Sequence, residues 1–194
     1  MDERRFNASL AHRLDDPDRL LWLPPAKVLD ALAVRPGETI ADVGAGTGYF
    51  SVPLAHAVGP SGKVYAVDAQ PEMLVWLRQK LNEGGLSNVE AVDAEADRTG
   101  LPDANCNLVF LANVWHEFAD CSAVLRESTR VLKAGGRIAI LDWRTDVEPE
   151  HGPPLDHRVE ASRAMESLRS AGFEQVASAE VGRYSWLVQG EILQ

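Results

Sequence analysis

The stretch Asp42-Val43-Gly44-Ala45-Gly46-Thr47-Gly48 lies at the end of a short predicted strand at residues 39–43 and precedes a predicted helix at residues 50–58. Glycines at alternate positions allow a tight turn with positive φ and leave no Cβ in the way of a ligand. The start of the following helix offers free backbone N–H groups, which suit a carboxylate or a phosphate. This stretch therefore predicts a ligand-binding turn at the carboxyl end of a buried strand.

Outward from this turn, strand-like runs alternate with helix-like segments. Strands are predicted at residues 39–43, 64–67, 89–92, 108–112 and 137–141, with helices starting at Pro25 and Pro71 and spanning residues 50–58, 120–132 and 161–171. This alternation is typical of βαβ units and a parallel sheet. Two final strands, at residues 175–180 and 184–191, are too close in the chain to be parallel. The predicted fold class is α/β: a Rossmann-like, seven-stranded, mostly parallel sheet with an antiparallel last strand at its end and helices on both faces.

The chain has 194 residues, enough for one domain. Residues 1–24 read as an N-terminal arm or lid, and residues 25–194 as the main domain. Nineteen Lys and Arg against 29 Asp and Glu give a net charge of −10, which argues against a broad nucleic-acid surface. The two cysteines, Cys106 and Cys121, suit a reducing cytoplasm, and no run approaches the roughly 20 apolar residues of a membrane span.

A carboxylate follows the second predicted strand. Asp68 stands twenty residues beyond Gly48, where it can accept hydrogen bonds from both hydroxyls of a ribose and would repel a 2′-phosphate. A dinucleotide-binding loop reads G-x-G-x-x-G, but Tyr49 occupies the place of the third glycine here. The two features indicate a nucleoside-bearing ligand, and the departure counts against a nicotinamide dinucleotide.

These segments together resemble the class I S-adenosylmethionine-dependent methyltransferases, and most of all the ubiquinone/menaquinone-biosynthesis (type 11) family. The glycine turn resembles the family's first motif. Further resemblances are Val64-Tyr65-Ala66-Val67-Asp68 to the ribose-binding strand, Asp93-Ala94-Glu95 to the adenine segment, Leu111-Ala112-Asn113-Val114-Trp115-His116-Glu117 to the strand end beneath the methionine moiety, and Leu132-Lys133-Ala134-Gly135-Gly136-Arg137 to the turn into the fifth strand. The resemblance covers about residues 25–190.

The resemblance implies S-adenosylmethionine as cofactor and a small molecule as methyl acceptor. It implies that the three glycines admit the methionine part, that Asp42 braces the turn, and that Asp68 binds the ribose. It also implies that Asp93 and the Ala94 N–H contact the adenine and that Asn113 closes the floor. The implied cofactor-binding residues are Asp42, Gly44, Ala45, Gly46, Gly48, Asp68, Ala69, Asp93, Ala94, Asn113 and Val114.

The acceptor side requires a base only if the nucleophile must lose a proton. His116, just past the fourth predicted strand, is the candidate catalytic residue, although a histidine that packs or caps the next helix would look the same. Glu117 and Asp142 are further candidates, with a solvated acid and a loop brace as their ordinary alternatives. The segment 151–158, with two His, an Asp and an Arg, is predicted to be a rigid lid held by Arg158 and Asp156 rather than a metal site.

Two other functions stay open at this stage: a methyltransferase-like binding or regulatory protein without turnover, and a nicotinamide-dependent oxidoreductase. The arm carries Trp22, which can cover the crevice, pack into the core or form an oligomer contact. We expect no nucleic-acid partner, no membrane span and no metal, a cytoplasmic location, and a monomer or homodimer.

Overall fold

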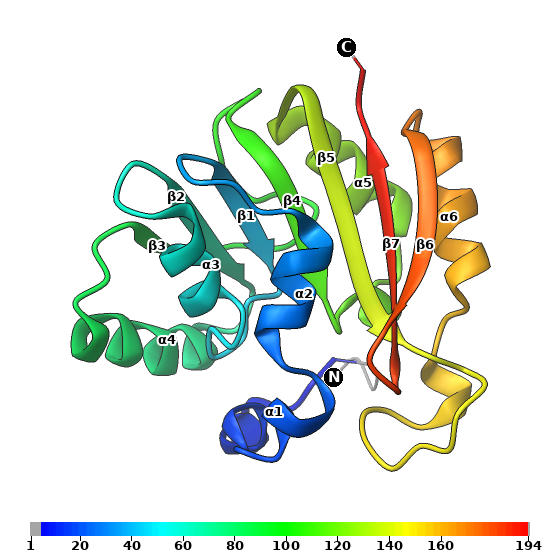
Figure 1. The fold of residues 1–194 in the computed structure, drawn as a ribbon, viewed down its shortest axis with the longest axis horizontal. Helices are drawn as coiled ribbons and strands as arrows, with labels where there is room; N and C mark the ends of the chain where they lie inside the picture. The colour runs from blue at the N-terminus through cyan, green and yellow to red at the C-terminus, as the bar shows by residue number, and fades with distance from the viewer. Residues whose placement is uncertain (1–4, 194) are drawn as a thin grey trace.

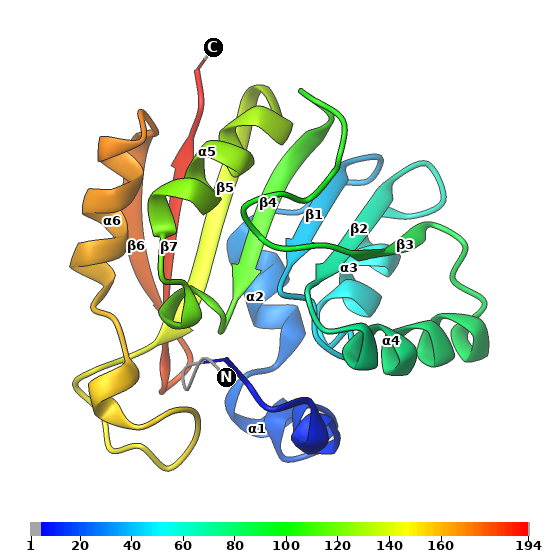
Figure 2. The ribbon, with the colours of Figure 1, turned by 180° about the vertical axis from the view of Figure 1, so that it is seen from behind.

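The computed structural model describes residues 5–193 and contains a twisted sheet with helices on both faces (Figures 1 and 2). The strands are β1 (Thr39–Val43), β2 (Lys63–Asp68), β3 (Val89–Asp93), β4 (Cys106–Ala112), β5 (Leu132–Trp143), β6 (Glu174–Val181) and β7 (Ser185–Glu191). They form one seven-stranded sheet in the order β3-β2-β1-β4-β5-β7-β6. The chain therefore adds β2 and β3 on one side of β1 and places β4 on the other side. This reversal of the strand order leaves a crevice at the carboxyl ends of β1 and β4.

The pairing of the strands confirms the predicted α/β class. All neighbours from β3 to β5 are parallel, whereas β7 runs antiparallel to both β5 and β6. The antiparallel strand thus lies one place in from the edge, not at the end of the sheet, because β6 takes the edge position. A tight β6–β7 connection forces the antiparallel pair, but it does not decide which of its two strands adds to β5.

Strand β5 begins five residues before its predicted start at Arg137, and that boundary was wrong. The glycines expected to stop the preceding helix lie inside the strand. Gly135 N donates to Ile192 O at 2.8 Å, and Ile192 N donates to Gly136 O at 2.9 Å. Backbone pairing with the end of the chain therefore extends the strand through a segment that looks like a turn. Strand β4 also begins before its predicted start at residue 108, and the buried Cys106 is its first residue.

Two layers of helices cover the sheet. The helices are η1 (Ala8–Asp15), α1 (Arg19–Trp22), α2 (Pro25–Leu32), α3 (Ser51–Val58), α4 (Pro71–Gly84), η2 (Trp115–Glu117), α5 (Cys121–Val131), η3 (Leu155–His157) and α6 (Ala161–Ser170). Helices α2 and α3 pack on one face, and α5 and α6 on the other (Figures 1 and 2). No helix of the described residues has the length and apolar character needed to cross a bilayer.

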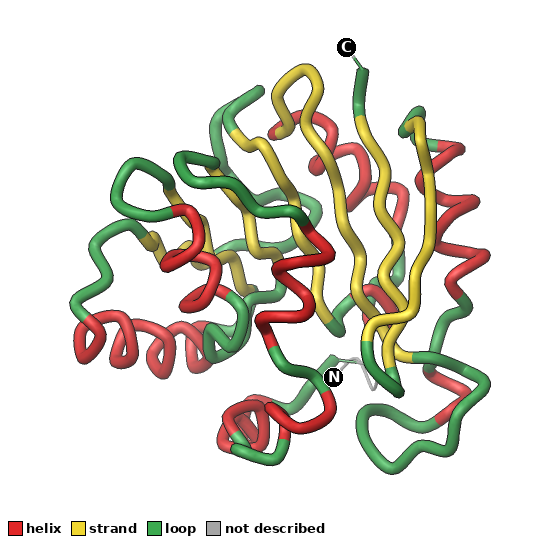
Figure 3. Tube along the Cα trace, viewed as in Figure 1, coloured by secondary structure: helices red, strands yellow, loops and turns green. Residues whose placement is uncertain are grey.

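The N-terminal arm, described here from residue 5 to residue 24, packs across the carboxyl ends of the strands. Asp15 accepts hydrogen bonds from Thr47 Oγ1 at 2.9 Å and from Lys80 Nζ at 2.5 Å. The Phe6 carbonyl accepts one from the Gln70 amide at 3.1 Å. Figure 3 shows that the arm and the long loop after β5 lie at the same end of the sheet. Both segments are thus placed over the crevice.

Candidate active site

A cavity of about 920 Å³ occupies the crevice at the carboxyl ends of the strands. Its walls come from the glycine turn, the ends of β2 and β4, the N-terminal arm and the loop after β5, called here the β5 loop (residues 144–158). The predicted site residues that line it are Asp42, Gly44, Ala45, Gly46, Asp68, Ala69, Ala94, Asn113, Val114 and His116. Most of the residues implied by the resemblance therefore converge on one space.

Two predicted cofactor residues, Gly48 and Asp93, do not line this cavity. Gly48 has φ +85°, and a Cβ there would overlap the Leu77 side chain of α4. Its lack of a side chain serves the packing of α4 against the turn. Asp93 is exposed at the end of β3, whereas the residues that follow it, beginning with Ala94 and Glu95, reach the cavity wall.

The glycine turn and Asp68 hold each other in place. Gly46 N donates to Asp68 Oδ2 at 2.7 Å, and Gln70 N donates to Oδ1 at 2.9 Å. Burial raises the pKa of Asp68, although the two backbone hydrogen bonds oppose the shift. Each carboxylate oxygen has a further lone pair, so the fixed group can still accept hydrogen bonds from a ligand.

The turn also depends on close contacts behind it. Gly44 has φ +75°, and a Cβ there would stand 2.8 Å from Val114 Cγ2. Asp42 Oδ2 accepts a hydrogen bond from Ser51 Oγ at 2.5 Å, which ties the end of β1 to the start of α3. Burial raises the pKa of Asp42 to about 7. Asp42 thus links the two elements on either side of the turn, and its role as a brace of the turn stays a prediction.

Asn113, directly after β4, combines an unusual backbone with an unpaired side chain. Its φ is +57°, and its backbone N–H donates to Leu141 O at 2.7 Å. Its Oδ1 and Nδ2 atoms are buried, and neither finds a hydrogen-bond partner within residues 5–193. An unpaired buried polar group costs roughly 1–3 kcal/mol. A ligand in the cavity that bonds to this amide would recover that free energy.

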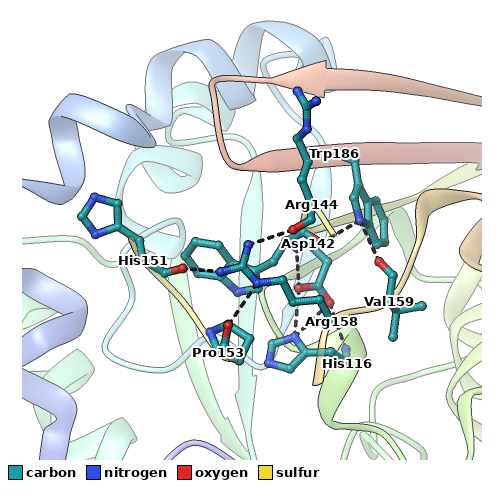
Figure 4. A network of polar contacts seen from close by, with 9 residues as sticks. His116, Asp142, Arg144, His151, Pro153, Arg158, Val159 and Trp186 are labelled. Carbon is teal, nitrogen blue, oxygen red and sulfur yellow. Dashed lines mark hydrogen bonds and ion pairs between the residues drawn. The ribbon is translucent and has the colours of Figure 1, made fainter. Parts of the chain in front are cut away.

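His116 and Asp142 form a buried pair at the ends of β4 and β5 (Figure 4). His116 Nδ1 lies 2.9 Å from Asp142 Oδ1, and the His116 backbone N–H donates to Oδ2 at 2.9 Å. Trp143 N donates to Oδ1 at 2.8 Å, so the carboxylate is held on three sides. A carboxylate at Nδ1 selects the tautomer that carries its proton there, which leaves Nε2 as the basic nitrogen.

The electrostatics of this pair strengthen the base. Burial alone would lower the pKa of His116, but the hydrogen bond and charge of Asp142 outweigh it and raise the pKa. Glu117, the next residue, is half-buried on the cavity wall, and burial raises its pKa to about 7. Glu117 is therefore not the solvated acid that the sequence allowed.

The β5 loop is organised around Arg158, as predicted for a rigid lid (Figure 4). Its guanidinium donates to the carbonyl oxygens of Arg144 at 2.8 Å, His151 at 2.6 Å and Pro153 at 3.0 Å. Asp156 does not share this role: it is exposed, and its side chain forms no hydrogen bond to the residues that the structure describes.

The β5 loop meets the N-terminal arm through aromatic contacts. The His151 ring stacks on Trp22, with 4.6 Å between centroids and 11° between planes. Trp22 also stands 5.4 Å from Trp143 and 6.2 Å from Tyr184, centroid to centroid. In the described part of the chain, no three His, Cys, Asp or Glu side chains gather as metal ligands would.

Comparison with known proteins adds family evidence to this geometry. The model of the ubiE/COQ5 methyltransferase family matches residues 19–189. The chain is 35% identical over 122 residues to the ubiquinone/menaquinone biosynthesis C-methyltransferase UbiE of Hahella chejuensis, covering 62% of this chain and 49% of that protein. UbiE of Shewanella frigidimarina is 34% identical over 124 residues, which cover 63% and 48% of the two chains. The chain thus aligns with about half the length of these curated relatives.

Solved structures are similar over nearly the whole chain, and one of them also has a similar sequence. The crystal structure of a SAM-dependent methyltransferase from Aquifex aeolicus superposes with a TM-score of 0.91 and 36% identity, covering 97% of this chain and all of that one. This structural similarity covers a larger share of the chain than the match to the curated relatives does.

Proposed function

Because the chain belongs to the ubiE/COQ5 methyltransferase family, we propose that it transfers a methyl group from S-adenosylmethionine to a small-molecule acceptor. The observation that carries this proposal is one cavity that joins the fixed carboxylate of Asp68 to the buried base His116. A ligand that contacts the first would present its reactive group in the same space as the second.

The residues on the glycine side fit the cofactor. Asp68 has lone pairs left for the two ribose hydroxyls, and its position is fixed by Gly46 and Gln70. The unpaired amide of Asn113 offers the N–H donors of Nδ2 and the acceptor Oδ1 to a polar ligand in the cavity. S-adenosylmethionine supplies an electrophilic methyl group on a sulfonium, so the protein's task is mainly to orient the reactants.

The residues on the other side fit an acceptor that must lose a proton. His116 Nε2 takes that proton, while Asp142 holds the ring and stabilises the imidazolium that forms. The arm and the β5 loop close over the cavity at Trp22 and His151, which limits access of water to the reacting atoms. A phenol, an amine or an acidic carbon would each suit this arrangement.

The proposal also covers the partners, the location and the domain organisation of the protein. The net charge of −10 supports a small-molecule acceptor without a nucleic-acid partner. Both cysteines are unpaired, which supports a cytoplasmic location. We assign residues 25–194 to the methyltransferase domain and residues 1–24 to an N-terminal arm or lid, and we propose that the protein is a monomer or a homodimer.

Calorimetric titration with S-adenosylhomocysteine, with NAD as control, tests the cofactor. We expect micromolar binding of S-adenosylhomocysteine alone, and binding of NAD in its place would overturn the proposal. A screen of phenols, amines and quinone precursors with methyl-labelled S-adenosylmethionine then tests turnover. Binding without transfer to any acceptor would favour the regulatory protein over the enzyme.

A further inference from the structure

Arg19 is a buried cation in the wall of the cavity. It lies in α1 of the N-terminal arm and is only 7% exposed. Its Nη1 donates to Leu14 O at 2.9 Å, and its Cζ stands 3.9 Å above the Tyr49 ring. The Tyr49 hydroxyl donates to Leu23 O at 2.7 Å, so the ring beneath the guanidinium is fixed as well. The guanidinium is therefore held in one place beside the glycine turn.

No carboxylate within residues 5–193 forms an ion pair with Arg19, and its Nε is buried without a hydrogen-bond partner. The carboxylates of Asp15 and Asp42 act on Arg19 only through their charge. Asp15 forms its ion pair with Lys80, and Asp42 accepts its hydrogen bond from Ser51. Burial lowers the pKa of Arg19 to about 10, since its charged form is poorly solvated. A buried charge that lacks a partner is costly, and an anion delivered by a ligand would offset that cost.

We propose that Arg19 binds a carboxylate of the ligand in the cavity, and that this is the carboxylate on the methionine part of S-adenosylmethionine. This inference rests on the function proposed above. Arg19 stacks on Tyr49, the residue after the glycine turn, and that turn is where the methionine part is proposed to lie. A guanidinium fork binds a carboxylate through two parallel hydrogen bonds, which a lysine cannot do.

The position of Arg19 on the arm gives the contact a second consequence. The arm is held to the domain by polar contacts of Asp15 with Thr47 and Lys80, and by the Trp22–His151 stack. A carboxylate bound to Arg19 adds an ion pair between this lid and the ligand itself. Cofactor binding therefore also fastens the cover of the cavity.

The test compares S-adenosylmethionine with decarboxylated S-adenosylmethionine, which lacks only the carboxylate. Binding of both is measured by calorimetry for the wild type, for Arg19→Met and for Arg163→Met. Methionine keeps the apolar stem over Tyr49 and removes the charge. Arg163 makes the same charge change at an exposed site on α6, outside the cavity.

We expect the wild type and Arg163→Met to bind S-adenosylmethionine about 10- to 100-fold more tightly than its decarboxylated form. Arg19→Met should bind the two alike, at the wild-type affinity for the decarboxylated form. Because the readout is a ratio within one protein, a partly unstable variant still gives an answer. Arg19→Gln serves if Arg19→Met does not fold.

Two results would overturn this assignment while the proposed function stands: a wild type without the preference, and an Arg19→Met protein that keeps it. Benzoate, added in the presence of S-adenosylhomocysteine, is the probe for an acidic acceptor. If Arg19→Met still prefers S-adenosylmethionine over its decarboxylated form but no longer binds benzoate as the wild type does, Arg19 binds the carboxylate of an acidic acceptor. A wild type that binds neither cofactor form would overturn the proposed function itself.

Discussion

The two walls of the cavity are held in place by different kinds of contact. The glycine wall, which comprises the turn at residues 44–46 and Asp68, is made of backbone N–H groups that donate to one carboxylate. The histidine wall, which comprises His116, Asp142 and the β5 loop, also uses backbone groups, but it depends on side chains that meet across different elements: the His116 ring contacts Asp142, and Arg158 donates to loop carbonyls. Backbone geometry leaves a trace in the sequence because it requires glycine at fixed spacing. Side-chain pairs leave no such trace, so their partners emerge only from the fold.

The histidine wall should carry the chemistry, and His116→Ala should have the largest effect. Loss of a general base lowers turnover by about 10²- to 10⁴-fold. The affinity for S-adenosylhomocysteine should stay unchanged, because the glycine wall is intact. Turnover is measured with the acceptor found in the screen, and His56→Ala, an exposed histidine of α3, is the control. A His116→Ala enzyme with wild-type turnover would reduce this histidine to a packing residue.

Asp142→Asn should have a smaller effect on rate and a distinct effect on pH dependence. We expect turnover to fall by roughly 10- to 100-fold, since the base remains but loses its orienting charge. Asp142 raises the pKa of His116, and a base works when it is unprotonated. The limb of the pH–rate profile that rises with pH should therefore move to lower pH in the variant. A purely structural role for Asp142 predicts a lower rate with the limb unmoved.

The glycine wall should carry affinity, which Asp68→Ala tests. The lost charge-assisted bonds should weaken cofactor binding by about 1–3 kcal/mol while turnover at saturating cofactor changes little. Asp93→Ala is the matched comparison, because this acid ends the neighbouring strand but is exposed and outside the cavity wall. Calorimetry should show the larger loss for Asp68. Equal losses would mean that Asp93 contacts the adenine, as the resemblance implies.

Much of the fold and of the glycine wall could be predicted from the sequence. The alternation of strands and helices, the turn at residues 42–48 and the place of Asp68 all depend on contacts between successive βαβ units. These contacts follow from chain order once a parallel sheet is assumed. The position of β7 and the early start of β5 could not be predicted, since both depend on pairing with the end of the chain.

The histidine wall was predicted only as separate residues. His116 and Asp142 were both candidates, but their pairing requires that β4 and β5 be neighbours in register. Nothing in the sequence marks Arg19 as buried, because its stretch is rich in charges that are mostly exposed. The expected order of the strands, with β4 beside β5, could have indicated that His116 and Asp142 pair. The placement of Arg19, in contrast, depends on how the arm folds across the crevice.

Gly48 sharpens the same comparison within a single motif. Gly44 and Gly46 line the cavity, whereas Gly48 accommodates Leu77. Gly48→Ala should therefore lower the free energy of unfolding by about 1–3 kcal/mol through overlap and positive φ. Cofactor affinity in the folded protein should be nearly unchanged. Thermal unfolding measures the loss, and a second substitution, Leu77→Ala, should remove the part due to overlap, so the effects of the two changes should not be additive.

The smallest expected effect is at the contact between the arm and the β5 loop. Trp22→Leu removes the stack on His151, which is worth about 0.5–1.5 kcal/mol beyond burial. The sheet keeps its own core, so global stability should change little, while local opening of both segments becomes more frequent. Hydrogen exchange should then be faster in residues 5–24 and 144–158 and unchanged in β4 and β5. Opening of either segment would uncover the cavity. Faster exchange in the arm but not in the β5 loop would show that the hydrogen bonds of Arg158 hold that loop without the Trp22 contact. In that case only the arm would act as the lid.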